Sequence, residues 1–167
     1  MMNSNDRKST KAILCENQFG GVAITVVEER TIDTPNGYFS VTLLGELERM
    51  KAADALDALE NERPVNTYTI VDKEQIDKKY TDSPFRDAWK NDLTTDIDKA
   101  KDIVHVQRRV KRKERFTPLD IQATIPDLAV EAESKRKIIR AENAKIKADV
   151  NKATTEAALI TQLKKVI

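Results

Sequence analysis

Glycine occurs only in the first 45 residues, and its absence from the rest of the chain most restricts what the chain can fold into. The four glycines are Gly20, Gly21, Gly37 and Gly45, so 122 residues follow without one. Glycine is the usual residue of left-handed turns, so a long tract without it is typical of helices. The eight aromatic residues all lie between Phe19 and Phe116, and the last 51 residues must pack through aliphatic side chains. We therefore expect a C-terminal helical arm or hairpin and not a globular core.

Charge divides the chain in the same way. The whole chain of 167 residues has a formal net charge of +1, but residues 1–98 carry −7 and residues 99–167 carry +8. Hydrophobic residues make up 40% and charged residues 34%, which is typical of a helix-rich protein with a thin core. The length suits one domain with an appendage, or two small domains.

Several classes of protein are not expected. No apolar run approaches the roughly 20 residues that span a bilayer, and the first ten residues lack the apolar segment of a secretory signal, so we expect neither a membrane protein nor an exported one. The single cysteine, Cys15, excludes an internal disulfide and a cysteine-based zinc site but leaves open a disulfide between chains, and a passive cysteine is favoured over a reactive thiol. His105 is the only histidine and has no nucleophile motif around it. We expect no metal, no cofactor and no enzymatic activity.

The N-terminal part has the pattern of a small β-containing module. Residues 1–15 are expected to be flexible, and residues 16–94 to form the module with its linker. The runs "GVAITVVEERTI" and "GYFSVTLLG" are rich in β-branched or aromatic residues, and "DTPNG" between them has turn chemistry, which predicts a hairpin. "ELERMKAADALDALENE" predicts a helix that Pro64 ends, and "VNTYTIVD" predicts a further strand. Three strands and one helix would leave sheet edges that seek a partner.

Residues 95–167 are expected to form the helical arm. Thr95, with Asp98 three residues later, predicts an N-cap for a helix that runs to about residue 115. A second start is predicted at "TPLD", residues 117–120, because a cap residue, a proline and a carboxylate follow one another there. Pro126 then opens a longer helix to about residue 153.

A narrow apolar stripe on that long helix predicts packing against another helix. Its members are Leu128, Ala132, Ile139, Ile146, Val150 and Ala153. A cap at Thr154 and Thr155 predicts a last helix with one apolar face, formed by Leu159, Ile160, Leu163, Val166 and Ile167. This helix is expected either to fold back on the long helix or to dock on another subunit.

The segment "RRVKRKER", residues 108–115, is the strongest charged feature, with six basic residues in eight. A helical wheel places Ile103, Val106 and Val110 on the opposite side, which describes a basic amphipathic helix. A solvated or protein-facing role is favoured over nucleic acid, because no aromatic residues are interleaved with the cations and no DNA-binding motif surrounds them. A membrane surface is the least favoured partner.

"DSPFRDAWKND", residues 82–92, sets the only tryptophan among five charged residues. Phe85 and Trp89 are four residues apart on an expected helical turn, and a local packing anchor is favoured over a ligand platform. The acidic residues show no spacing that singles out a catalytic pair.

Taken in order, several of these stretches resemble a family of small tailed-bacteriophage and prophage proteins. They are "YTIVD", "SPFRDAWKND", "DIDKAKDIVHVQRRVKRKERFTPLDIQATIP" and "KATTEAALITQLKKV", and the similarity covers roughly residues 65–167. The first 45 residues are longer and more β-rich than that family's opening. The resemblance implies a non-enzymatic virion component of the tail, fibre or neck region. It also implies that Phe85, Ala88 and Trp89 pin the junction between the module and the basic helix.

The expected fold class is α+β, with a small N-terminal antiparallel sheet-plus-helix module followed by an extended α-helical arm or hairpin. The expected function is that of a structural or adaptor subunit of a phage particle, located in the virion and, during assembly, in the host cytoplasm. Its expected partners are other virion proteins, copies of itself or a larger symmetric assembly. An assembly chaperone absent from the mature particle and a nucleic-acid-binding protein are the alternatives. The residues expected at protein interfaces are Phe85, Trp89, Arg108, Arg109, Lys111, Arg112, Arg115, Leu159, Leu163 and Val166.

Overall fold

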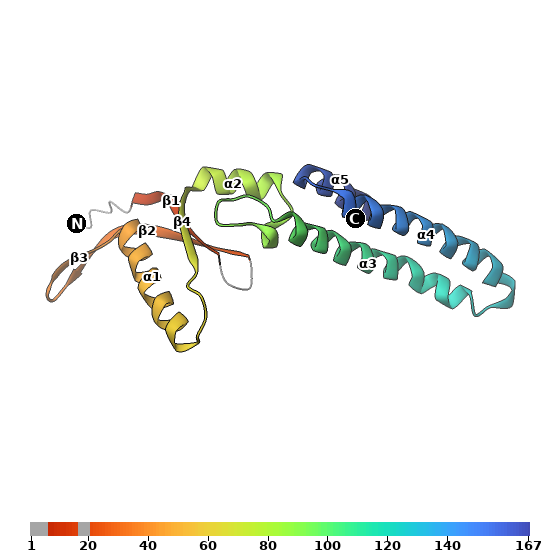
Figure 1. Cartoon of the computed structure of the whole chain (residues 1–167), viewed down its shortest axis with the longest axis horizontal. Coiled ribbons are helices and arrows are strands. Elements are labelled where there is room, and N and C mark those ends of the chain that lie inside the picture. Colours follow the sequence, from red (N-terminus) through yellow and green to blue (C-terminus); the bar gives the residue numbers. More distant parts are fainter. Residues whose placement is uncertain (1–6, 17–20) are drawn as a thin grey trace. The chain divides into compact units, whose positions relative to one another are not determined.

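The computed structural model describes residues 7–16 and 21–167 (Figure 1). It divides into two compact units, of which the first ends at Thr95 and the second begins at Asp96. The first unit holds a four-stranded antiparallel sheet with two helices, and the second unit is helical. The expected α+β fold class with an extended C-terminal helical part is confirmed.

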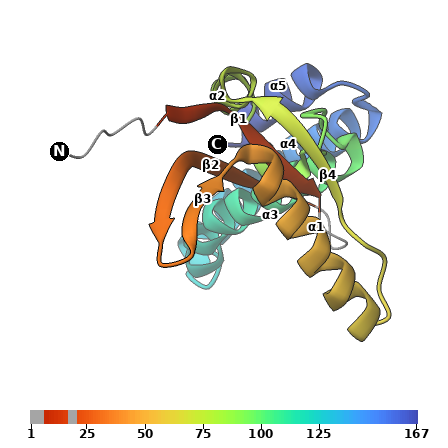
Figure 2. The ribbon, with the colours of Figure 1, turned by 90° about the vertical axis from the view of Figure 1, so that its left-hand side faces the viewer.

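The sheet of the first unit has the strand order β3-β2-β1-β4. Its strands are β1 (Arg7–Glu16), β2 (Val22–Thr34), β3 (Gly37–Val41) and β4 (Thr67–Asp72). The long strand β2 pairs with β1 through its first half and with β3 through its second half. Figure 2 shows the β2–β3 ribbon curving away from the other strands.

Residues 1–15 were expected to be flexible. This expectation is wrong for residues 7–15, which belong to the strand β1, and residues 1–6 lie outside the described part. β1 pairs with β2 along one edge and with β4 along the other, so it is a central strand. Ala12, Ile13 and Leu14 are completely buried. Successive side chains of a strand point to opposite faces, so even this short apolar run contributes to packing on both sides of the sheet.

Two helices cover the two faces of the sheet (Figure 1). On one face, Ile13 and Val27 pack with Leu43 and Leu47 of α1 (Leu43–Glu60). On the other face, Ala12 and Leu14 pack with Ile76 of α2 (Lys73–Asp82), a helix that the sequence analysis did not predict.

The predicted hairpin and the helix after it are both present. The β2–β3 turn ends at Gly37, whose φ of +119° is a conformation that L side chains rarely adopt. α1 begins three residues before the predicted start, because the Thr42 side chain caps it by accepting a hydrogen bond from the Gly45 amide at 3.1 Å. That cap also ends β3 at Val41.

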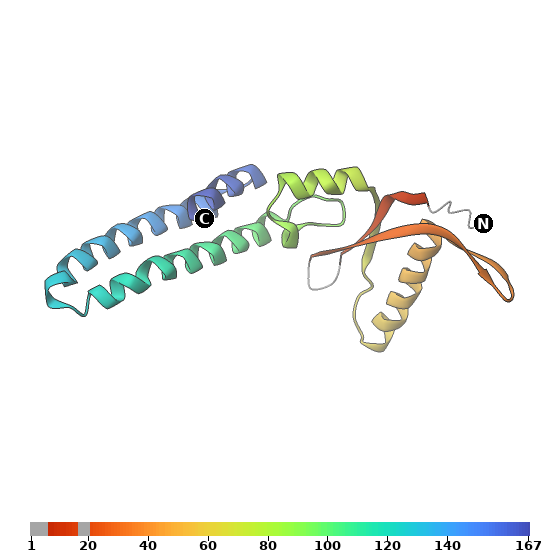
Figure 3. The ribbon, with the colours of Figure 1, turned by 180° about the vertical axis from the view of Figure 1, so that it is seen from behind.

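The helical unit consists of α3 (Ile97–Gln122), α4 (Pro126–Lys152) and α5 (Glu156–Val166). α3 and α4 lie side by side as a hairpin, and α5 returns alongside it (Figure 3). The predicted cap at Thr95 is wrong by one residue, because Asp96 accepts the hydrogen bonds from the amides of Asp98 and Lys99, both at 3.1 Å.

α3 also runs through the predicted break near residue 115. Pro118 lies inside the helix, so the restart predicted at residues 117–120 is wrong. A proline in a helix interior removes one backbone hydrogen bond. Leu119 is nevertheless buried, and Thr117 donates its hydroxyl proton to the Lys113 carbonyl at 3.0 Å. We infer that the packing of the following turn offsets the lost bond.

The predicted starts of the last two helices agree with the structure, whereas Leu128 of the predicted stripe and Ile167 of the predicted last apolar face are 38% and 72% exposed. Pro126 is the first residue of α4, and Thr155 caps α5 by accepting a hydrogen bond from the Ala158 amide at 3.3 Å. The buried members of the predicted stripe on and just after α4 are Ala132, Ile139, Val150 and Ala153. α5 packs against α3 and α4, so of the two alternatives it folds back on its own chain.

Candidate functional site

The only tryptophan lies in a buried cluster of the first unit. Trp89 is 1% exposed, and its ring meets the Tyr80 ring edge to face, with centroids 4.9 Å apart. Its Nε1 donates a hydrogen bond to the Ser83 hydroxyl at 3.4 Å. The expected helical turn is a 3₁₀ turn over Arg86–Ala88, after which Trp89 is extended. Phe85 and Trp89 are therefore not stacked one α-helical turn apart, although both are buried.

The charged neighbours of Trp89 form an exposed rim around this cluster. They are Asp82, Arg86, Asp87, Lys90 and Asp92, all of them exposed. Asp92 accepts hydrogen bonds from the Thr94 hydroxyl at 2.6 Å and from its amide at 2.9 Å, which lower the pKa of that carboxyl. The polar sequence around Trp89 is thus a short loop whose charges face solvent while its aromatic side chains pack inward.

A second polar cluster ties the end of α1 to β4. The buried carboxylate of Asp54 lies 2.7 Å from Arg63 Nη2 and accepts hydrogen bonds from the Asn66 amide and side chain at 2.7 and 2.6 Å. Burial alone would raise the pKa of Asp54, but these partners hold it below its ordinary value. This network fixes the loop between the two elements.

The lone cysteine and the lone histidine are not part of a cluster of metal-ligating side chains among the described residues. Burial raises the pKa of the Cys15 thiol, and burial also raises the pKa of its neighbour Tyr68 to about 12. His105 Nε2 lies 2.9 Å from the side-chain oxygen of Asn151. Within residues 7–16 and 21–167, no group of three or more His, Cys, Asp or Glu side chains is placed to hold a metal ion.

The basic helix turns a different face inward from the one that the wheel indicated. Val106 and Val110 are about half exposed, whereas Arg108 is partly buried. The side of α3 that packs inward runs from the buried Val104 to the buried Leu119, at helical spacing. Ile103 of the predicted apolar side is partly buried, but Val106 and Val110 are not packed inward, and part of the basic segment lies in the seam between the helices.

Arg108 is the most enclosed of these cations. Its Nη1 approaches the Asn143 carbonyl at 3.5 Å, which is at the limit for a hydrogen bond. Its Nε is buried and has no hydrogen-bond partner among the described residues, and the same is true of the buried Oδ1 of Asn143. Burial lowers the pKa of Arg108, and the neighbouring charges of Arg109 and Arg112 lower it further.

Three other cations of the segment have partners within the helical unit. Arg115 Nη1 lies 2.7 Å from Glu142, and Lys111 lies 3.3 Å from Glu114. The guanidinium of Arg112 lies 5.1 Å from the Phe116 ring centroid. These contacts keep the side chains of Arg115, Lys111 and Arg112 close to the α3–α4 hairpin.

A cleft forms where these cations meet α5. It has a volume of about 30 Å³, and its lining residues come from all three helices of the unit: Arg108, Lys111, Arg112, Arg115, Asn143, Ile146, Lys165 and Val166. Within the described part of the chain, none of the eight residues that line this cleft is an aspartate or a glutamate.

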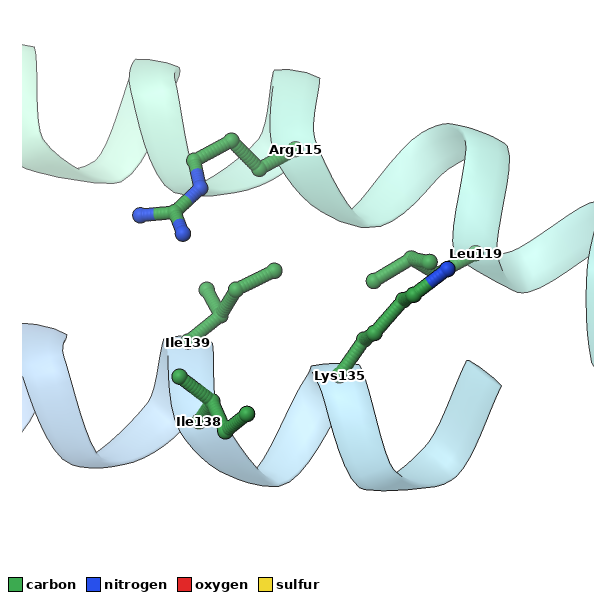
Figure 4. A pocket seen from close by; sticks show the side chains of 5 residues that line it. All are labelled: Arg115, Leu119, Lys135, Ile138 and Ile139. Atoms are coloured by element: carbon green, nitrogen blue, oxygen red, sulfur yellow. The ribbon is translucent and has the colours of Figure 1, made fainter. Parts of the chain in front are cut away.

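A larger and more apolar groove lies further along the hairpin (Figure 4). It encloses about 300 Å³ between α3 and α4. Arg115 and Leu119 line it from α3, and Lys135, Ile138 and Ile139 line it from α4. Leu119 and Ile139 are buried, whereas Ile138 is 58% exposed. The same end of the hairpin exposes further large apolar side chains, namely Ile121, Ile125, Leu128 and Val130.

The residues predicted at protein interfaces thus fall into three groups. Phe85, Trp89, Leu159 and Leu163 are buried inside their own units, and for Phe85 and Trp89 this agrees with the packing anchor that the sequence favoured. Arg108, Lys111, Arg112, Arg115 and Val166 come together around the small cleft. Arg109 is exposed. The apolar groove was not predicted from the sequence, because its Ile138 lies outside the predicted stripe of α4.

None of the helices in the described part is long and apolar enough to cross a membrane. A scan of protein-family models and searches of curated proteins and of solved structures found no match to this chain.

Proposed function

We propose that this chain is a structural or adaptor subunit that works by protein–protein assembly, in the tail, fibre or neck region of a tailed-bacteriophage particle. The observation that carries the assembly role is the exposure of large apolar side chains. On the helical hairpin, Val130 is 81% and Ile138 is 58% exposed, and on the β2–β3 hairpin, Tyr38 is 81% and Phe39 is 60% exposed. Clustered exposed apolar side chains are typical of surfaces that bind other proteins.

The placement in a phage particle rests on the resemblance of residues 65–167 to small tailed-phage proteins. The partners proposed are other virion proteins or further copies of this chain. An assembly chaperone that leaves before the particle is complete would use the same apolar surfaces, so exposure does not separate these two roles.

Nucleic-acid binding is the weaker alternative. Its support is the cluster of six cations in residues 108–115, yet Arg108 is largely enclosed and Arg115 is paired with Glu142. Cations that are already engaged in the hairpin are poorly placed to meet the regularly spaced phosphates of a duplex.

Charge substitutions on α4 test the assembly role. We expect Val130→Lys and Ile138→Lys to abolish incorporation into particles, because a buried lysine at an apolar contact is strongly unfavourable. Ala144→Lys, at an exposed position of the same helix that lies away from Val130 and Ile138, is the matched control and should be incorporated normally. Incorporation is measured by immunoblot of purified particles, with circular dichroism to show that each variant is folded. Normal incorporation of both lysine variants would contradict the proposed contact surface.

A further inference from the structure

Five cationic side chains converge on one cleft of the helical unit. Four of them come from α3 and one comes from α5: Arg108, Lys111, Arg112, Arg115 and Lys165. Like charges held this close repel each other, and partial burial strengthens the repulsion. An arrangement of this kind is most stable when an anion lies among the cations.

The carboxylates nearby compensate only part of this charge. Arg115 pairs with Glu142 and Lys111 with Glu114, and the four side chains are about half exposed, so the pairs are screened by solvent. Neither Arg108 nor Arg112 forms an ion pair with any residue of the described chain. Lys165 donates a hydrogen bond to Gln162 at 3.1 Å, which is a neutral partner. An excess of positive charge therefore remains around the cleft.

Arg108 adds a directed donor to this charge. Its Nε–H is buried without an acceptor among the described residues, and a buried donor left unpaired is destabilising. The pKa of Arg108 is lowered, first by burial and then by Arg109 and Arg112, so a neighbouring negative charge would stabilise the guanidinium. An anionic oxygen in the cleft would supply both the missing acceptor and the missing charge.

The size of the cleft indicates what kind of anion fits. The roughly 30 Å³ of this open cleft is close to the volume of one water molecule, so one oxygen of a ligand can enter while the rest of the ligand stays at the mouth. Arg112 and Lys165 line the same cleft and are exposed, so they can hold the remaining oxygens there. The fork of an arginine guanidinium matches the oxygens of a phosphate group.

We propose that the cleft formed by Arg108, Arg112 and Lys165 binds a single free oxyanion of the phosphate class. The anion joins α3 to α5 and neutralises the cations of the seam. Because it binds the folded unit and not the unfolded chain, its concentration sets part of the stability of that unit. This inference does not depend on the particle role, since it concerns the helical unit alone.

The test is a thermal melt of the full chain in inorganic phosphate and in sodium chloride of equal ionic strength. We expect about 10 mM phosphate to raise the melting temperature by about 3 °C, the shift for a ligand present at roughly ten times its Kd. The double variant Arg112→Gln/Lys165→Gln should lose this rise, whereas Lys147→Gln, an exposed lysine of α4, should keep it. Isothermal titration of the unmutated protein with phosphate should give one site per chain, which keeps the test valid even if the double variant folds poorly.

Three results would overturn the proposal. One is an equal melting temperature in phosphate and chloride together with no heat of binding. Another is a phosphate-induced rise that persists in a folded double variant. A short single-stranded DNA that displaces phosphate from the site would also overturn it, because the ligand would then be a nucleic-acid backbone and not a free oxyanion.

Discussion

Replacing Trp89 with alanine removes the largest fully buried side chain of the chain. The change leaves a cavity and removes the edge-to-face contact with Tyr80, whose ring centroid is 4.9 Å away. Truncating a buried tryptophan costs about 3–5 kcal/mol, of which about 1 kcal/mol belongs to an aromatic pair of this geometry. We expect Trp89→Ala to destabilise the first unit by at least about 3 kcal/mol, a large part of the total stability of a small domain. The hydrogen bond to Ser83 adds little at 3.4 Å.

Urea unfolding followed by far-ultraviolet circular dichroism measures this loss, since the variant has no tryptophan fluorescence. Two further variants calibrate it. Trp89→Phe keeps a ring next to Tyr80 and should cost about 1–2 kcal/mol. Leu59→Ala, at a position 78% exposed on α1, should shift the midpoint little. A Trp89→Ala midpoint equal to that of the unmutated chain would refute the packing role and favour a surface contact.

The remaining predictions concern the buried carboxylate and the basic helix. The folded pKa of Asp54 lies below its unfolded value near 4, so its contribution to stability is present above about pH 4 and is lost as the pH falls through the folded pKa. Asp54→Asn should lower the urea midpoint at pH 7 and flatten the fall in stability below pH 4; an unchanged acid profile would show that Arg63 does not hold this carboxylate in solution. Duplex DNA should bind weakly at about 0.15 M salt, with a Kd on the order of 10⁻⁵ M, because Arg108 and Arg115 are engaged in the hairpin. Nanomolar binding in a fluorescence-anisotropy titration at that salt concentration would favour the nucleic-acid alternative.

Elements that carry their own local signals were predictable from the sequence. The β2–β3 hairpin has turn residues between two β-rich runs, and its Gly37 takes the left-handed conformation expected there. α4 has a proline at its first position and α5 has a capping threonine before its first residue, and both helices begin where these residues indicate. Such signals depend on a few neighbouring residues, so they survive in any tertiary setting.

Elements fixed by tertiary contacts were not predictable in this way. β1 has only four consecutive apolar residues after a polar stretch, and its order comes from pairing with β2 and β4, which are distant in sequence. Pro118 has the local pattern of a helix start, but α3 continues through it because the packing of the buried Leu119 stabilises the next turn. The wheel of the basic segment predicted its apolar side as the buried one. The contact with α4 and α5 instead leaves Val106 and Val110 about half exposed and places Arg108 in the seam, because these helices pack along the line from Val104 to Leu119.

The proposal that this chain is a particle subunit is tested most directly by quantitative mass spectrometry of particles purified from lysates of cells that produce this chain. We predict that its peptides remain with the particles through a density gradient, at a fixed ratio to the major capsid protein. Recovery of the chain only in the soluble fraction of the lysate, with none in the gradient-purified particles, would contradict the structural-subunit role and favour an assembly chaperone.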